Sequence, residues 1–166
     1  MKYTPKKKDV TIRAIYFILF VFSIFSMNIG KGYVKTIFYC LSILSLVASL
    51  YLLIRYEFYR YEYIITDKDD KYYFYINKYI GRRGAYVCYF SMDDAVEIKT
   101  KSEISKKELQ KQYDKISFNS YCQNITITKD RTYLIFKDDD SYICLVLEMS
   151  GDIVNEINEY IKKKNG

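Results

Sequence analysis

The chain of 166 residues contains no histidine, no tryptophan and only one proline. Without histidine, it cannot form the Ser-His or Cys-His pair of many nucleophilic enzymes, nor a mixed cysteine–histidine metal site. Cys88, Cys122 and Cys144 lie in the C-terminal part of the chain, and no two of the four cysteines have CxxC spacing. We therefore expect reduced thiols, with no disulfide framework, no metal, no cofactor and no catalytic residue, and hence no enzyme.

The basic side chains are concentrated near the N-terminus. Residues 1–13 carry five basic side chains against one acidic side chain, and the segment 30–35 adds Lys31 and Lys35. Residues 55–166 carry 19 basic and 19 acidic side chains, so this part has no net charge. Nucleic-acid binding normally requires a basic patch on the folded domain, so we expect no nucleic-acid partner.

Two long stretches of the chain carry no charge. The first has 17 residues between Arg13 and Lys31, and the second has 19 residues between Lys35 and Arg55. A helix rises about 1.5 Å per residue, so 19 residues approach the ~30 Å hydrocarbon thickness of a bilayer. We predict transmembrane helices over about 12–30 and 35–55. A cleaved signal peptide is the alternative for the first stretch, but no small-x-small cleavage site follows it.

The short link 30–35 predicts a tight transmembrane hairpin over 14–55, so both termini lie on one side of the membrane. The positive-inside rule makes residues 1–13 a basic cytosolic tail, and both termini of this multi-pass cell-membrane protein cytoplasmic. The stretches 14–30 and 36–54, which form the interior of the two spans, carry no charged residue, which argues against transport. Five serines in the spans favour close helix packing or oligomer contacts, namely Ser23, Ser26, Ser42, Ser45 and Ser49.

Residues 56–166 have the pattern of a β-rich cytosolic domain. Short runs of Tyr, Ile, Val and Thr alternate with clusters of turn residues. On one strand, Phe74 and Ile76 are predicted to face the core, whereas Tyr73, Tyr75 and Asn77 face outward. The predicted strands are 58–66, 71–80, 84–91, 95–100, 115–119, 124–128, 131–137 and 141–148.

The segment 150–163 is the clearest predicted helix outside the spans. Its isoleucines recur at a spacing of four residues, and three lysines fall in its last turn. The polar segment 102–114 is predicted to hold a short helix or a crossover. The fold class is therefore a membrane α-helical hairpin plus an α+β domain, with a mostly antiparallel sheet or partial barrel closed by the C-terminal helix.

Three segments carry a family resemblance, namely YEYIIT (61–66), FYINKYIGRR (74–83) and DDAVEI (93–98), together with the final strand and helix over 142–161. They resemble small two-span Firmicute membrane proteins of unknown function, with a departure at 84–86, where Gly-Ala-Tyr replaces further basic residues. The layout is also similar to bacterial pleckstrin-homology-like domains. These resemblances imply a fold and a location, and no reaction.

Lys78, Arg82 and Arg83 surround Gly81 at a predicted hairpin tip. They are our candidates for contact with an anionic headgroup or another ligand near the membrane, and a solvated turn is the alternative. Tyrosines of the strands 58–66 and 71–80 are expected to form cross-strand ladders, with a ligand-stacking surface as the alternative. The ladder residues are Tyr59, Tyr61, Tyr63, Tyr73 and Tyr75.

Two functions fit this organisation. The first is a non-enzymatic, membrane-tethered β domain that binds a partner or forms oligomers. Its partners are the lipid bilayer and a second copy or another membrane protein. The alternative is a membrane-perturbing effector of phage defence, whose β-barrel senses a cyclic nucleotide. An enclosed interior cavity favours the effector, whereas a sheet plugged by the helix 150–163 favours the first function.

Overall fold

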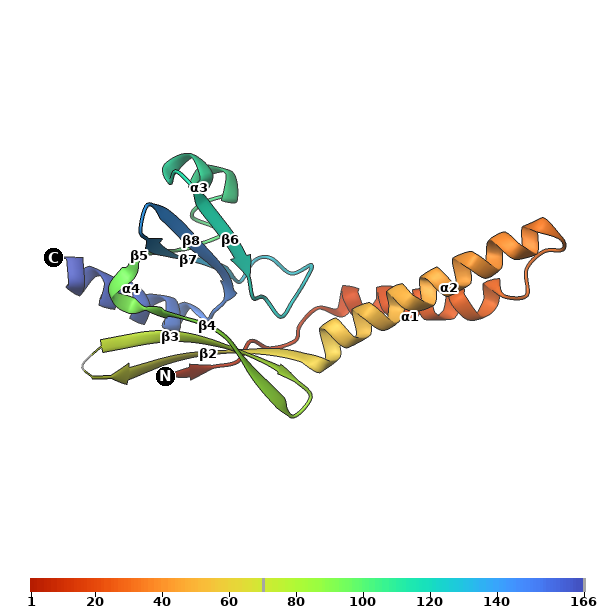
Figure 1. The fold of residues 1–166 in the computed structure, drawn as a ribbon, viewed down its shortest axis with the longest axis horizontal. Coiled ribbons are helices and arrows are strands. Elements are labelled where there is room, and N and C mark those ends of the chain that lie inside the picture. The colour runs from red at the N-terminus through yellow and green to blue at the C-terminus, as the bar shows by residue number, and fades with distance from the viewer. Residues whose placement is uncertain (70, 166) are drawn as a thin grey trace. The chain divides into compact units, whose positions relative to one another are not determined.

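The computed structural model describes residues 1–69 and 71–165, which form two compact units. One unit comprises Lys8–Tyr59, and the other combines Met1–Lys7 with the chain from Arg60 onward. The fold is α+β, with two helices in the first unit and two sheets in the second (Figure 1). The chain therefore crosses between the units twice, at residues 7–8 and 59–60.

The first unit is a helical hairpin. Helix α1 spans Val10–Ser26, and α2 spans Tyr33–Leu53 and continues as a π-helical turn, η1, over Ile54–Phe58. The Asp9 carboxylate caps α1 by accepting a hydrogen bond from the Ile12 N–H at 3.2 Å. Tyr33–Phe58 is long and apolar enough to cross a membrane, judged by length and composition, while α1 is apolar but shorter.

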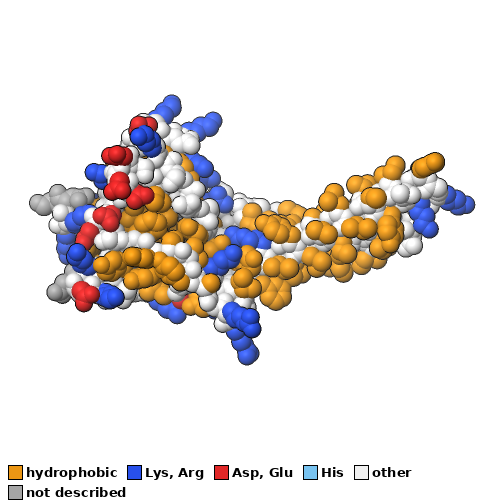
Figure 2. Space-filling view, in the orientation of Figure 1, with side chains coloured by type: hydrophobic (Ala, Val, Ile, Leu, Met, Phe, Trp, Pro, Cys, Tyr) orange, Lys and Arg blue, Asp and Glu red, His pale blue; other side chains and the backbone are white. Residues whose placement is uncertain are grey.

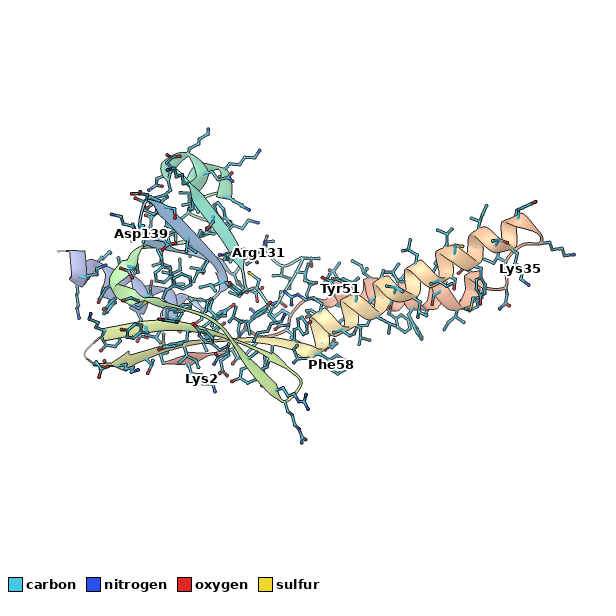
Figure 3. All side chains as sticks on the ribbon, viewed as in Figure 1. Lys2, Lys35, Tyr51, Phe58, Arg131 and Asp139 are labelled. Atoms are coloured by element: carbon cyan, nitrogen blue, oxygen red, sulfur yellow. The ribbon has the colours of Figure 1, made fainter. Side chains whose placement is uncertain are left out.

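The second unit begins with a four-stranded sheet in the order β1-β2-β3-β4. Its strands are β1 (Lys2–Tyr3), β2 (Tyr59–Lys68), β3 (Lys71–Ile80) and β4 (Arg83–Ser91). The pairing of β1 with β2 was not expected from the sequence, because a two-residue strand has no periodicity to detect. Lys2 lies on this edge strand (Figure 3).

The second sheet has the order β5-β7-β8-β6. Its strands are β5 (Ala95–Thr100), β6 (Ile116–Ser120), β7 (Arg131–Asp138) and β8 (Ser141–Glu148), and the 3-10 turn η2 (Met92–Asp94) leads into β5. Strand β6 pairs with β8 in parallel, so this sheet is mixed. In the described residues, the strands form two sheets and no closed barrel.

The predicted strand 124–128 is wrong, because these residues form a loop between β6 and β7. The Glu148 carboxylate accepts the backbone N–H groups of Gln123 and Asn124, both at close range (3.0 Å and 2.9 Å). These backbone donors are satisfied by a side chain, which takes the place of a strand ladder. The other seven predicted strands are present, and those over 71–80, 95–100 and 141–148 have the predicted bounds.

The main core lies between the two sheets. Phe74 and Ile76 of β3 are buried as predicted, at 1% and 0% exposure, against Leu134 and Phe136 of β7. The C-terminal helix α4 (Gly151–Asn165) adds Ile157 and Ile161 to this core, close to the predicted helix 150–163.

A smaller core lies on the other face of the second sheet. Helix α3 (Lys106–Gln112) lies within the polar segment 102–114 and buries Leu109 against Ile135 and Cys144. Each sheet therefore has an inner face toward the main core. The outer face of the second sheet is packed against α3, and the outer face of the first sheet carries the residues described below.

Candidate functional site

The helical hairpin buries its small polar side chains and exposes its large apolar ones. All five serines singled out from the sequence are buried, with exposures between 1% and 8%. The Ser42 hydroxyl donates to the Ser23 carbonyl at 2.6 Å, and the Ser49 hydroxyl donates to the Tyr16 carbonyl at 2.7 Å. Figure 2 shows the apolar side chains over the surface of both helices, among them Phe17, Phe25, Ile37, Leu44, Val47 and Leu50.

Charged and aromatic side chains join the start of α1 to the end of α2. The Arg13 guanidinium forms an ion pair with Glu57 at 3.0 Å, and the Tyr16 hydroxyl donates to the same carboxylate at 3.2 Å. The Tyr56 hydroxyl accepts the Asp9 N–H at 2.7 Å. Arg13 and Glu57 are 44 positions apart, so no local sequence pattern predicts this pair.

The three predicted contact residues lie at the turn of the β3–β4 hairpin. Ile80 pairs with Arg83, so Gly81 and Arg82 form a two-residue turn, and Gly81 has the positive φ of 61° that favours glycine. Arg82 and Arg83 are exposed, and Lys78 is half-buried opposite Ala85. The structure thus brings the three basic residues together at one end of the hairpin.

Four tyrosines on the outer face of the first sheet form a continuous cluster, which we call the tyrosine face. Its members are Tyr73 and Tyr75 of β3 and Tyr86 and Tyr89 of β4. The Tyr75 and Tyr89 rings stack at 5.7 Å between centroids, and Tyr73 and Tyr86 lie 6.1 Å and 6.2 Å from Tyr89. Tyr86 and Tyr89 each remain 56% exposed.

A β-bulge allows both β4 tyrosines to share this face. Ile76 pairs with Cys88 and Asn77 pairs with Tyr86, so Val87 is an extra residue in β4. In an unbroken strand, side chains three positions apart point to opposite faces, and the extra residue restores a common face. The alternation in β3 was sufficient to predict that Tyr73 and Tyr75 face outward. The bulge that brings Tyr86 to the same face could not be predicted from the strand pattern.

The predicted ladder between β2 and β3 tyrosines is wrong for Tyr61 and Tyr63. Their exposures are 6% and 2%, so both lie in the core, whereas Tyr73 and Tyr75 belong to the outer face. Tyr63 packs against Phe74 at 6.2 Å, consistent with the inward parity of β3. The partners of the outer tyrosines come from β4.

Beside the tyrosine face, Glu62 of β2 is neutralised and covered. It is 5% exposed, accepts a hydrogen bond from the Tyr79 hydroxyl at 3.0 Å and pairs with Lys2 at 3.0 Å. The Arg60 guanidinium lies over the Tyr79 ring at 5.2 Å. A side chain at Gly84 would meet this ring, because its Cβ would lie 2.6 Å from the nearest ring carbon. The ring therefore lies directly over the Gly84 backbone.

Glu148 is the centre of a buried polar cluster. Burial raises the pKa of its carboxyl, although hydrogen bonds from Asn124 and Gln123 act in the opposite direction. The Asn124 side-chain amide donates to this carboxylate at 3.0 Å and to the Lys6 carbonyl at 2.9 Å. The cluster therefore fastens both the loop 121–130 and the N-terminal segment to the end of β8.

The four cysteines range from the exposed Cys40 to the buried Cys122 and Cys144. All four are free thiols, and burial raises the pKa of Cys144 to about 12. Across residues 1–69 and 71–165, no group of three or more histidine, cysteine, aspartate or glutamate side chains is placed to hold a metal ion.

Comparison of the chain with protein-family models, curated proteins and solved structures found no match.

Proposed function

We propose that the chain is an integral membrane protein in which the α1–α2 hairpin spans the bilayer and the α+β unit is a non-enzymatic binding module. The observation that carries this proposal is the packing of the hairpin. Its serines are buried, and large side chains such as Leu44 (67% exposed) and Phe25 (69% exposed) face outward. In water, so much exposed apolar surface is unfavourable, whereas lipid tails solvate it and small residues allow close helix contact.

The charge distribution supports a cytosolic position for the module. The tail 1–13 carries five basic side chains and the link 30–35 carries two, so the positive-inside rule favours cytoplasmic termini. Lys35 lies at the link end of α2, opposite the end that bears Phe58 (Figure 3). Under this topology, the link faces the outside of the cell.

The module binds a partner through its surface, either a second copy or another membrane protein, and contacts the lipid bilayer. Its two sheets and C-terminal helix support the proposed likeness to pleckstrin-homology-like domains. Lys78, Arg82 and Arg83 provide a cationic end to the β3–β4 hairpin that suits an anionic group. In the described residues, the buried acid Glu148 is held by backbone and amide donors, which supports a structural role for it.

The cyclic-nucleotide effector is less well supported. It requires a barrel with an enclosed interior, whereas the described strands form two open sheets. Ile157 and Ile161 of α4 fill the space between these sheets, at 1% and 4% exposure. This packing favours a binding surface over an internal ligand site.

Topology is tested by cysteine labelling of intact cells with a membrane-impermeant reagent. Tyr33→Cys, in the link, is expected to label from outside, because Tyr33 is 91% exposed. Lys107→Cys, on α3, is expected to label only after permeabilisation. Release of the chain by alkaline carbonate would contradict membrane integration, and ready labelling of Lys107→Cys on intact cells would contradict the orientation.

A further inference from the structure

We propose that the outer face of the first sheet docks onto the anionic lipid headgroups of the bilayer that holds the hairpin. The docking surface consists of the tyrosine face and the tip residues Arg82 and Arg83. This inference rests on the proposed function, because it requires α1 and α2 to lie in that bilayer. It adds a second, reversible contact between the module and the membrane.

The strands that carry the docking surface have an excess of basic side chains. Residues 71–91 contain four basic side chains and no acidic side chain, although residues 55–166 as a whole are balanced. On the neighbouring strand β2, Glu62 is already paired with Lys2 and covered by Tyr79, and Asp67 lies near the β2–β3 turn. By register, Lys78 and Arg83 follow the parity of the core-facing residues of β3, while Arg82 lies in the turn itself. The tip therefore presents Arg82 and Arg83 without an acidic side chain from β3 or β4, which favours an anionic leaflet over a neutral one.

The tyrosine face has the chemistry that suits the headgroup region of a bilayer. A tyrosine combines an apolar ring with a hydroxyl, and this combination is stable at the depth of the headgroups. Tyr86 and Tyr89 are 56% exposed, and contacts with neighbouring rings already hold their side chains in place. Because little side-chain freedom remains to be lost, docking of these rings costs little entropy.

The chain connects the helical hairpin directly to the first sheet. Arg60 packs over Tyr79, so the start of β2 and the basic end of the β3–β4 hairpin lie at the same end of the sheet. Only residues 56–59 separate Arg60 from Arg55, the residue that ends the predicted second span. An extended chain covers about 3.5 Å per residue, so the connection allows at most about 18 Å between Arg55 and Arg60.

The absence of tryptophan from the chain allows a test without background. Tyr89→Trp places one probe on the tyrosine face, and Gln112→Trp places a control probe on α3 at the other outer face. The full chain is reconstituted in nanodiscs of phosphatidylcholine, with or without phosphatidylglycerol, and quenching by headgroup spin-labelled lipid is measured. We expect Tyr89→Trp to be quenched more strongly than Gln112→Trp, and only when phosphatidylglycerol is present.

Removal of the tip charges tests the electrostatic part. Arg82→Gln with Arg83→Gln in the Tyr89→Trp chain is expected to lower the docked-to-undocked ratio roughly 30-fold in anionic nanodiscs, since it removes two cations at the surface. The matched control, Lys107→Gln with Lys111→Gln on α3, removes the same charge and is expected to leave quenching unchanged. Equal loss in both double variants would overturn the proposal, because docking would then follow net charge alone.

A probe within the hairpin separates this inference from the proposed function. Leu44→Trp is expected to be quenched by acyl-chain spin labels in both lipid mixtures. If Leu44→Trp is quenched and Tyr89→Trp is not, only the docking proposal fails. If neither is quenched, the hairpin is not in the bilayer and the proposed function fails. If Tyr89→Trp responds only to dilution of the protein, the face contacts a second copy and the docking proposal is wrong.

Discussion

The helical hairpin and the α+β unit follow opposite packing rules. In α2, Ser42 is 1% exposed and Leu44, two positions later, is 67% exposed. In β8, Leu145 and Leu147 are fully buried, and the strand begins with the half-buried Ser141. The helical hairpin thus buries hydroxyl groups, whereas the α+β unit buries apolar side chains. Under the proposed function, this contrast reflects lipid as the solvent of one region and water as the solvent of the other.

Buried polar groups are satisfied differently in the two regions. In the hairpin, each buried hydroxyl donates one hydrogen bond to a nearby backbone carbonyl, as Ser42 does to Ser23 at 2.6 Å. In the α+β unit, Glu148 collects donors from a loop about 24 residues earlier in the chain. Two of the hairpin bonds, from Ser42 and Ser49, join the two helices, whereas the cluster at Glu148 fixes the path of a loop. We therefore expect the Glu148 cluster to contribute more to the free energy of unfolding than a single serine hydroxyl does.

The largest expected effect comes from the sheet core. Phe136 is fully buried and its ring packs 4.7 Å from Phe90 and 6.5 Å from Phe74. Phe136→Ala is expected to lower the free energy of unfolding by about 3–5 kcal/mol, because it leaves a cavity between the sheets. Guanidinium denaturation in detergent micelles, followed by tyrosine near-ultraviolet circular dichroism, measures this change.

Leu44→Ala in the hairpin is the matched control, since it truncates an apolar side chain that faces outward. We expect it to change the unfolding free energy of the α+β unit by less than about 0.5 kcal/mol. A loss comparable to that of Phe136→Ala would contradict the separation into two packing regions. It would show that the outward face of α2 is part of a protein core.

The buried carboxylate is expected to have the next largest effect. Glu148→Ala leaves backbone donors of Gln123 and Asn124 without their acceptor, which costs about 1–3 kcal/mol of unfolding free energy. The loop 121–130 should then lose hydrogen-exchange protection together with the N-terminal segment that Asn124 holds through Lys6. Unchanged protection in both segments would show that the cluster does not fasten them.

The pH dependence of the same group follows from its raised pKa. An unfolded glutamate titrates near pH 4.3, and burial raises the pKa of Glu148 in the folded chain. The folded state therefore binds more protons above pH 4.3, so this group's contribution to stability is complete below that pH and falls as the pH rises through the folded pKa. Glu148→Gln should remove this fall, as measured by denaturation at a series of pH values. A steeper fall of stability with rising pH in Glu148→Gln would contradict the predicted direction of this effect.

Periodic features were predictable from the sequence, and features set by distant residues were not. The alternation in β3 predicted the inward side chains Phe74 and Ile76, and the uncharged spans singled out the five serines that are now seen to be buried. The loop at 124–128 reads as a strand because Ile and Thr alternate there. Only the carboxylate of Glu148, supplied by another strand, shows why no ladder forms.

The candidate site shows the same division. Lys78, Arg82 and Arg83 were found from a local turn signal around Gly81, and this turn is present. The tyrosine face depends on the register of β4 against β3 and on the extra residue Val87. Register is decided by pairing across the hairpin and by core packing behind it, so a single strand's composition does not contain it.

The smallest expected effect concerns the hairpin hydroxyls. Ser42→Ala and Ser49→Ala each remove one hydrogen bond between the helices, and the small residue still permits their close approach. Each is expected to cost about 0.6 kcal/mol, since unfolded helices in lipid find other partners for a hydroxyl. An SDS titration, followed by energy transfer between dyes on engineered cysteines at Val10 and Phe58, measures helix separation in a background without the native cysteines.

Thr36→Ala, at an exposed position of α2, is the control for the serine variants and should have no effect. If the serine variants matched this control while Ser42→Leu separated the helices, the serines would act through their size, and hydrogen bonding would not be what holds the hairpin together.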